Sequence, residues 1–154
     1  TDESQTEGLF VSLRKSGTVI PIRASSELTP KNCVENLLDD NDDTYWSSCN
    51  EPNQWFEVGT GGKQIQIKQI LIHPWGLCFP KIWRLSGSMD GESWEEIMVS
   101  ENDTRLTNDE AVVVVDVNAR KAYTNFKVQA LSKSFSDQDT FCFFYFDVLG
   151  TVVG

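Results

Sequence analysis

The stretch "SGSMDGESWEEI", residues 86–97, contains the clearest turn signal of the chain. Its Asp90-Gly91 pair lies between two segments rich in β-branched and aromatic residues. Asp-Gly is favoured in hairpin turns because both residues tolerate a positive φ. The sequence therefore predicts a β-hairpin that turns at residues 89–92 and joins strands at 82–88 and 94–99.

Outward from this hairpin the chain contains six further segments with strand-like composition, several of them with alternating apolar and polar residues. These segments are residues 18–25, 54–58, 64–73, 111–117, 125–131 and 141–153. Within 64–73, the isoleucines at 65, 67, 70 and 72 share one face only if the alternation slips near residues 68–69, which predicts a β-bulge. Only residues 30–38 have a helical pattern. About eight short strands with turn signals between them predict an all-β protein, either a β-sandwich or a jelly roll.

Length and charge limit the organisation and the partners. A chain of 154 residues with 40% hydrophobic content is the size of one domain. We expect that domain at residues 16–154, with residues 1–15 as an N-terminal tail or a leading strand. The net charge of −10 argues against nucleic acid as a partner. No apolar run reaches the roughly 18 residues that span a bilayer, so a membrane-spanning segment is not expected.

The cysteines bear on the compartment. The four cysteines include no CxxC pair, and their spacing does not fit a zinc ribbon. Free thiols in a reducing compartment are the favoured interpretation, which predicts an intracellular location. An extracellular location stays open if a signal peptide has been removed.

Several motifs together, in a fixed order, carry a family resemblance. They are "ENLLDDNDDTYWSS" (35–48), "EPNQWFEVGTG" (51–61), the hairpin motif and "FDVLGTVV" (146–153). This order resembles the discoidin or coagulation factor type C domain, which implies an all-β fold, an eight-stranded galactose-binding-like jelly-roll β-sandwich. "NEPNQW" is similar to copies in intracellular BTB-domain proteins, and "GTVV" to the discoidin-like intraflagellar transport subunit. In this fold Trp46 and Trp55 are expected in the core.

The resemblance also implies a structural calcium ion, which prefers six to eight oxygen ligands. By position, the loop ligands are Asn36, Asp39, Asn41 and Thr44. The glutamate that the family supplies from the last strand is replaced by Tyr145, and the nearest carboxylate there is Asp147. The alternative is a loop without metal, whose side chains satisfy one another through Asx turns.

Catalytic motifs are not evident in the sequence. The single histidine, His73, ends a strand segment, and no GxSxG motif accompanies it. The segment "GTGGK" (59–63) is not followed by a helical pattern that could bind phosphate. We therefore predict a non-catalytic binding module.

Residues 73–81, "HPWGLCFPK", provide the main binding hypothesis, which is a protein partner. This loop concentrates large apolar residues between polar strands, and exposed apolar clusters mark interaction sites. The predicted anchor is Trp75, Leu77 and Phe79, and the predicted polar rim is Lys81, Asn50, Glu51 and Asn53.

Carbohydrate is the alternative ligand, because lectins of this fold bind sugars on loops at one end. The positions that bind sugar in the fucose-binding lectins that the chain resembles correspond to Ser47, Pro74 and Lys81, while Trp75 and Phe79 could stack on a pyranose ring. Phospholipid ranks third, because the net charge opposes attraction to anionic membranes.

Overall fold

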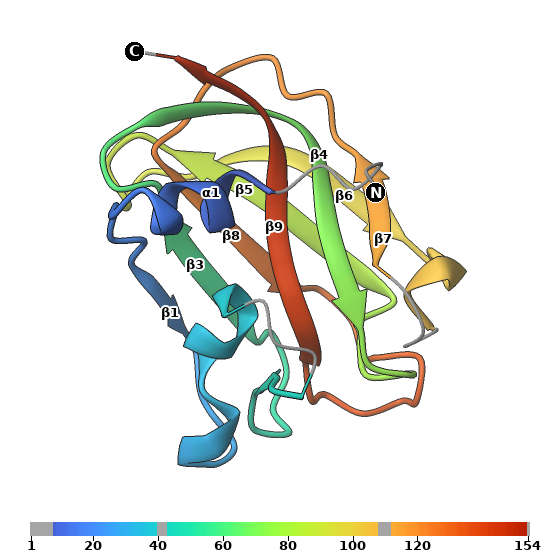
Figure 1. Ribbon diagram of the computed structural model, residues 1–154. Helices are drawn as coiled ribbons and strands as arrows, with labels where there is room; N and C mark the ends of the chain where they lie inside the picture. Colours follow the sequence, from blue (N-terminus) through green and yellow to red (C-terminus); the bar gives the residue numbers. More distant parts are fainter. Residues whose placement is uncertain (1–7, 40–42, 108–111, 154) are drawn as a thin grey trace.

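Two antiparallel sheets face each other in the computed structural model, which describes residues 8–39, 43–107 and 112–153 (Figure 1). The first sheet has the strand order β1 (Ile22–Ala24), β3 (Trp55–Gly59), β8 (Asn125–Ala130), β5 (Ile82–Ser88) and β6 (Glu95–Glu101). The second has the order β2 (Trp46–Ser47), β9 (Cys142–Val153), β4 (Gln64–Pro74) and β7 (Val113–Asp116). The predicted β-sandwich is confirmed, with nine strands among the described residues because β2 adds a short pair to β9.

Strand β4 shows how the sequence pattern sets the packing. The side chains of Ile65, Ile67, Ile70 and Ile72 are fully buried between the sheets. The register of β4 against β9 shifts between Ile67 and Gln69, which confirms the predicted bulge. One extra residue at this point returns the later isoleucines to the inner face, because side chains alternate along a strand.

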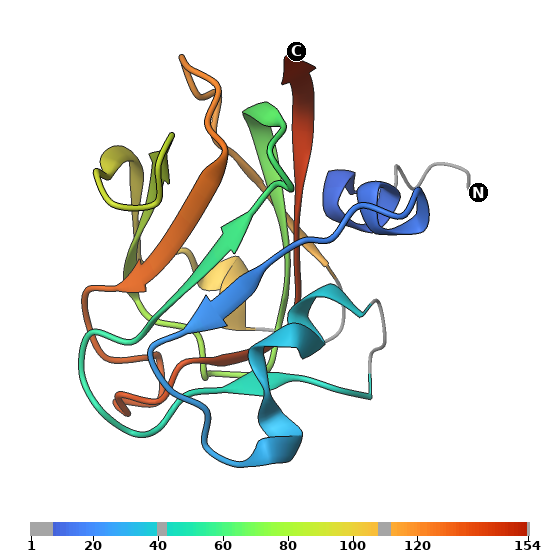
Figure 2. The same ribbon diagram turned by 90° about the vertical axis from the view of Figure 1, so that its left-hand side faces the viewer.

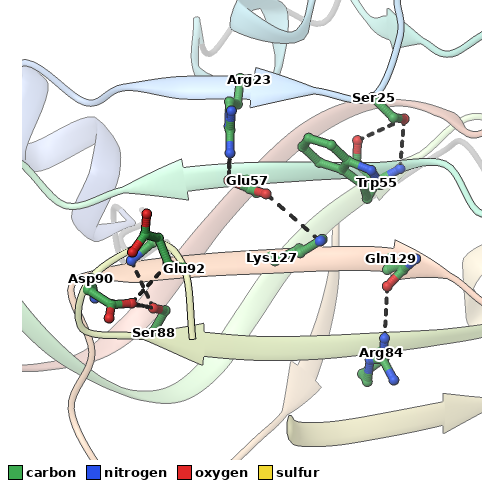
Figure 3. Close-up of polar contacts among 11 residues, drawn as sticks. Arg23, Ser25, Trp55, Glu57, Arg84, Ser88, Asp90, Glu92, Lys127 and Gln129 are labelled. Carbon is green, nitrogen blue, oxygen red and sulfur yellow. Dashed lines mark hydrogen bonds and ion pairs between the residues drawn. The ribbon is translucent and has the colours of Figure 1, made fainter. Parts of the chain in front are cut away.

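The predicted hairpin is also confirmed: β5 and β6 pair, and the chain turns between Ser88 and Glu95. Gly91 has a φ of 78°, which glycine adopts without strain. Asp90 Oδ1 accepts hydrogen bonds from the backbone N–H groups of Ser93 (2.9 Å) and Glu92 (2.8 Å), and Ser88 Oγ donates to the same oxygen (2.9 Å; Figure 3). These bonds, led by that from Ser93, lower the pKa of the Asp90 carboxyl.

The two tryptophans expected in the core lie in different places. Trp46 is fully buried, and its ring centroid lies 5.0 Å from Phe141 and 5.7 Å from Phe56. Trp55 lies on the outer face of the five-stranded sheet, so its predicted core position is wrong (Figure 3). The reason is the strand alternation, which turns its neighbour Phe56 inward.

Short helical segments complete the fold. The predicted helix-like stretch forms two 3₁₀ helices, η1 (Pro30–Asn32) and η2 (Val34–Leu38), and a third, η3, covers Thr104–Thr107.

The predicted tail or leading strand at residues 1–15 is corrected where the structure describes it. Residues Leu9–Lys15 form helix α1, which lies beside β9 (Figure 2). Phe10 is fully buried, and Asp147 of β9 accepts hydrogen bonds from the N–H groups of Phe10 (2.8 Å) and Val11 (3.1 Å). This carboxylate satisfies two of the N–H groups that a helix start leaves without a partner inside the helix.

The different positions of the two tryptophans give a matched pair of variants. Trp46→Ala should lower the free energy of unfolding by about 3–5 kcal/mol, the cost of deleting a large buried aromatic. Trp55→Ala should cost only about 1 kcal/mol, because it removes cation–π contacts at a partly exposed site. Urea denaturation of both variants measures the difference. Equal losses would show that the faces of β3 are assigned wrongly.

Candidate ligand-binding site

Three loops meet at one end of the sandwich, at the lower edge of Figure 1: residues 48–54, 75–81 and 131–140. The N–H group of Ser136 donates to the Leu77 carbonyl (3.2 Å). Lys81 Nζ forms an ion pair with Asp137 Oδ1 (3.0 Å). Backbone bonding and charge thus join the second loop to the third, and together with the first loop they form what we call the loop end.

Trp75 is partly exposed and rests on other aromatic rings. Its centroid lies 4.2 Å from Tyr45 and 5.7 Å from Phe144. Phe144 in turn lies 4.9 Å from His73. Tyr45 and Phe144 occupy the outer side of the four-stranded sheet, because their neighbours Trp46 and Phe143 are buried inside. The rings of Tyr45, His73, Trp75 and Phe144 form what we call the aromatic cluster.

The predicted apolar anchor is only partly present at the surface. Leu77 is 48% exposed, but Phe79 is fully buried, so its predicted place on the exposed anchor is wrong. The Phe79 ring packs edge-on against Phe141 (5.0 Å) and Phe143 (5.2 Å). It also packs edge-on against Trp83 of β5 (5.7 Å), and burial between these rings outweighs its position in a loop.

The positions inferred from the fucose-binding lectins are mostly inaccessible. Ser47 is 3% exposed and donates its hydroxyl to the Ser48 carbonyl, and Pro74 is buried. The structure therefore contradicts a direct role in sugar binding for both residues. Their burial follows from their places at the end of β2 and of β4, which both pair with β9.

The predicted polar rim holds the loops together. Asn50 Nδ2 donates to Gln138 Oε1 (3.2 Å), and Asn50 Oδ1 accepts the N–H of Asp139 (2.8 Å). Glu51 and Asn53 are exposed, and Asn53 has a φ of 61°. A ligand role for Lys81, Asn50, Glu51 and Asn53 stays a prediction.

Sequence reasoning missed the residues that support Trp75. Phe144 stands in the aromatic run of residues 141–146, where simple alternation does not separate inner from outer positions. The register of β9 against β4 shifts between His73 and Pro74, which pair with Tyr145 and Phe143. Phe144 therefore has no pairing partner on β4, and its ring lies on the outer side of the sheet, next to that of Trp75.

The outer face of the five-stranded sheet is a second polar and aromatic surface (Figure 3). Lys127 Nζ lies 4.8 Å from the centroid of Trp55 and 5.6 Å from that of Trp94. Arg23 and Lys127 both form ion pairs with Glu57. Both cations are therefore engaged by neighbouring side chains of this face, which gives them a structural role.

A cavity of about 430 Å³ lies between β6 and the segment that precedes β8. Its lining includes Glu95, Lys121 and Tyr123. Glu95 accepts a hydrogen bond from the Tyr123 hydroxyl (2.8 Å) and forms an ion pair with Lys121 (3.3 Å). Burial and this bond raise the pKa of Tyr123 to about 12, so the hydroxyl stays protonated at neutral pH.

The family model for the F5/8 type C domain matches residues 21–139. The chain belongs to the F5/8 type C family. This assignment confirms the resemblance to the coagulation factor type C domain, and it supports a non-catalytic binding module. A search of curated proteins found no match. None of the described helices is long and apolar enough to cross a membrane.

Several solved structures are similar to this F5/8 type C domain. The C-terminal domain of a chitobiase from Bacteroides fragilis has 22% identity and a TM-score of 0.71, with 88% of this chain and 95% of that chain covered. The chitosan-binding module 1 of a chitosanase/glucanase from Paenibacillus sp. IK-5 has 17% identity and a TM-score of 0.71, with 94% and 100% covered. CpGH89CBM32-5 from Clostridium perfringens, solved with GalNAc-β-1,3-galactose, has 17% identity and a TM-score of 0.73, with 94% and 100% covered. At these identities the likeness shows the fold.

The loop predicted to bind calcium has its described side chains engaged within the F5/8 type C domain. Asn36 Nδ2 donates to the carbonyls of Lys31 (2.8 Å) and Tyr45 (2.9 Å). Thr44 Oγ1 donates to Asp39 Oδ2 (2.6 Å). These bonds fit the alternative of a self-satisfied loop.

The last strand does not supply the missing carboxylate. Tyr145 donates its hydroxyl to Asp147 Oδ2 (2.8 Å), and Asp147 also accepts the N–H groups at the start of α1. Asn41 lies outside the described residues. Among the described predicted ligands only Asp39 is a carboxylate, so they supply little of the negative charge on which calcium affinity depends. Calcium binding stays a prediction.

Thermal unfolding with and without millimolar calcium tests that prediction. The hydrogen bonds described above predict an unchanged melting temperature. A calcium site would instead stabilise the folded state by mass action, and Asp39→Ala would abolish the increase. A calcium-dependent increase that needs Asp39 would therefore contradict the self-satisfied loop.

Proposed function

We propose that this domain is a carbohydrate-binding module whose loop end binds a glycan, with Trp75 as the platform. The observation that carries the proposal is the partly exposed Trp75 ring, held by Tyr45 at 4.2 Å and Phe144 at 5.7 Å. A pyranose ring presents C–H groups on its faces, which pack on an aromatic ring, and hydroxyls at its edge, which need polar partners. Sites that are mostly apolar with a few placed polar groups are typical of small-ligand binding.

Polar groups for the sugar hydroxyls are available in the neighbouring loops. Lys81 and Asp137 offer a donor and an acceptor, and their side chains are 36% and 77% exposed. Gln138 and Glu51 add exposed amide and carboxylate groups. The bond between Asn50 and the third loop limits the movement of these groups, which reduces the entropy lost on binding.

The similar structures support a glycan ligand, because two of them are named or solved as sugar-binding modules. The net charge of −10 favours neutral or amino-bearing sugars over sulfated sugars and uronates, which it would repel. We therefore infer a neutral or amino sugar as the ligand class.

A protein partner is the second candidate, and Leu77 is the observation that favours it. Its side chain is 48% exposed beside Trp75, where an aliphatic residue adds apolar contact area. The buried Phe79 no longer contributes to this hypothesis. Leu77→Ser separates the two candidates, because it should weaken a protein contact more than the stacking of a sugar on Trp75.

Titration calorimetry with chitosan oligosaccharide and with GalNAc-β-1,3-galactose tests the glycan proposal. Trp75→Ala should weaken binding of whichever sugar binds by at least about tenfold, or about 1.4 kcal/mol. Trp55→Ala is the matched control, because it removes a partly exposed tryptophan from the other sheet, and it should leave the affinity unchanged.

Two results would contradict the glycan proposal. One is the absence of saturable binding across a glycan array by the folded wild-type protein. The other is binding that depends on Trp55 and not on Trp75, which would move the site to the outer face of the five-stranded sheet.

A further inference from the structure

Two of the four free cysteines lie in contact beside the loop end. Cys78 belongs to the loop that follows β4, and Cys142 is the first residue of β9. The N–H group of Cys142 donates to the Cys78 carbonyl (3.3 Å). The backbones of the two residues are therefore at hydrogen-bonding distance, which brings Cys78 and Cys142 to the short separation that a disulfide requires.

The two thiols differ in reactivity. Cys142 is 3% exposed, whereas Cys78 is partly exposed. The hydrogen bond from Cys142 lowers the pKa of Cys78 to about 7, and the same bond and burial raise the pKa of Cys142. Near neutral pH, a large fraction of the Cys78 side chains is therefore in the thiolate form, which is the nucleophile.

We propose that Cys78 and Cys142 are a redox modification site, at which a small disulfide such as oxidised glutathione converts the thiol pair into an intramolecular disulfide. The Cys78 thiolate attacks one sulfur of oxidised glutathione, breaks its S–S bond and releases one glutathione thiolate. The Cys142 sulfur then attacks the Cys78 sulfur of the mixed disulfide. The new S–S bond forms as the second glutathione leaves, and the Cys142 proton passes to that thiolate. Two protein thiols are oxidised, and one oxidised glutathione is reduced to two thiols.

The other two cysteines do not compete for this bond. Cys33 Sγ donates to Asn36 Oδ1 (3.6 Å), and Cys49 Sγ donates to the Glu27 carbonyl (3.9 Å). Their contacts are to oxygen. Serine can keep both hydrogen bonds, so the C33S/C49S variant is a suitable background that retains only the proposed pair.

The disulfide would act on the candidate site through the loop. Trp75 and Leu77 lie within three residues of Cys78, and Cys142 is anchored in β9 by its pairing with Ser47. Cross-linking would tie the loop to the sheet and restrict its movement. Control of glycan affinity by this bond rests on the proposed function, but formation of the bond does not.

Incubation of folded C33S/C49S protein with oxidised glutathione, followed by intact-mass and peptide mass spectrometry, tests the proposal. We expect loss of two hydrogen atoms, a cross-link between the peptides of residues 78 and 142, and no retained glutathione. Adding Cys142→Ala should stop the reaction at a glutathione adduct on Cys78. Adding Cys78→Ser, at a partly exposed position, should leave Cys142 unmodified. A persistent glutathione adduct in C33S/C49S, or no reaction at all, would overturn the proposal.

Hydrogen exchange tests the effect on the loop without reference to any sugar. Amides of residues 75–79 should exchange more slowly in the oxidised than in the reduced C33S/C49S protein, and equal rates would overturn the constraint. Iodoacetamide labelling of Cys78 should accelerate with a midpoint near pH 7, the pKa that the neighbouring thiol gives it. If a glycan is found by calorimetry, its affinity should differ between the two forms, and that comparison alone depends on the proposed function.

Discussion

The pairing of β9 with β4 is the constraint on which the rest of the structure depends. These two long strands run side by side from Gln64↔Val153 to Pro74↔Phe143, in the centre of the four-stranded sheet (Figure 1). The inner face of β9 supplies Phe143, Phe146 and Val148 to the core. Its outer face supplies Asp147 to the start of α1 and Phe144 to Trp75. One strand thus determines both the core packing and the support of the candidate site.

The position of the candidate site follows from this arrangement. The loop that carries Trp75 connects the end of β4 to the start of β5. Within this loop the side chain of Phe79 is buried in the core. The residues between Pro74 and Phe79 are therefore held at both ends, which leaves Trp75 and Leu77 at the surface. A rigid sheet with a short anchored loop is the usual way in which binding residues are positioned.

Local chemistry made part of the fold predictable. The Asp90-Gly91 turn and the shift of phase among the isoleucines of β4 depend on neighbours within a few residues, so both could be found in the sequence. The side of the sheet that Trp55 occupies could not, because a slip of one residue exchanges the two faces of a strand. The start of α1 depends on Asp147, which is 137 residues from Phe10.

The candidate site was predictable only in outline. The concentration of apolar residues in 73–81 pointed to the loop that carries the partly exposed Trp75. Phe79 and Leu77 are both large and apolar, and nothing local distinguishes the one that enters the core. Ser47 and Pro74 were inferred by position from other lectins. Their burial here depends on the pairing of β2 and β4 with β9, which a comparison of positions does not predict. The contact of Cys78 with Cys142 also joins segments that are distant in the sequence. Cys142 is the first residue of β9, and Cys78 follows the end of β4, the strand that pairs with β9.

If the loop end around Trp75 is the binding surface, the indole N–H signals of the five tryptophans should report ligand binding there. Trp46 and Trp83 are buried, whereas Trp55, Trp75 and Trp94 are partly exposed and lie on different parts of the surface. The ¹⁵N-labelled protein is titrated with chitosan oligosaccharide or GalNAc-β-1,3-galactose and followed by NMR. We expect the Trp75 signal to shift in a saturable manner while those of Trp55 and Trp94 stay in place. A saturable shift of Trp55 and Trp94 with an unchanged Trp75 signal would show that the ligand binds to the outer face of the five-stranded sheet instead.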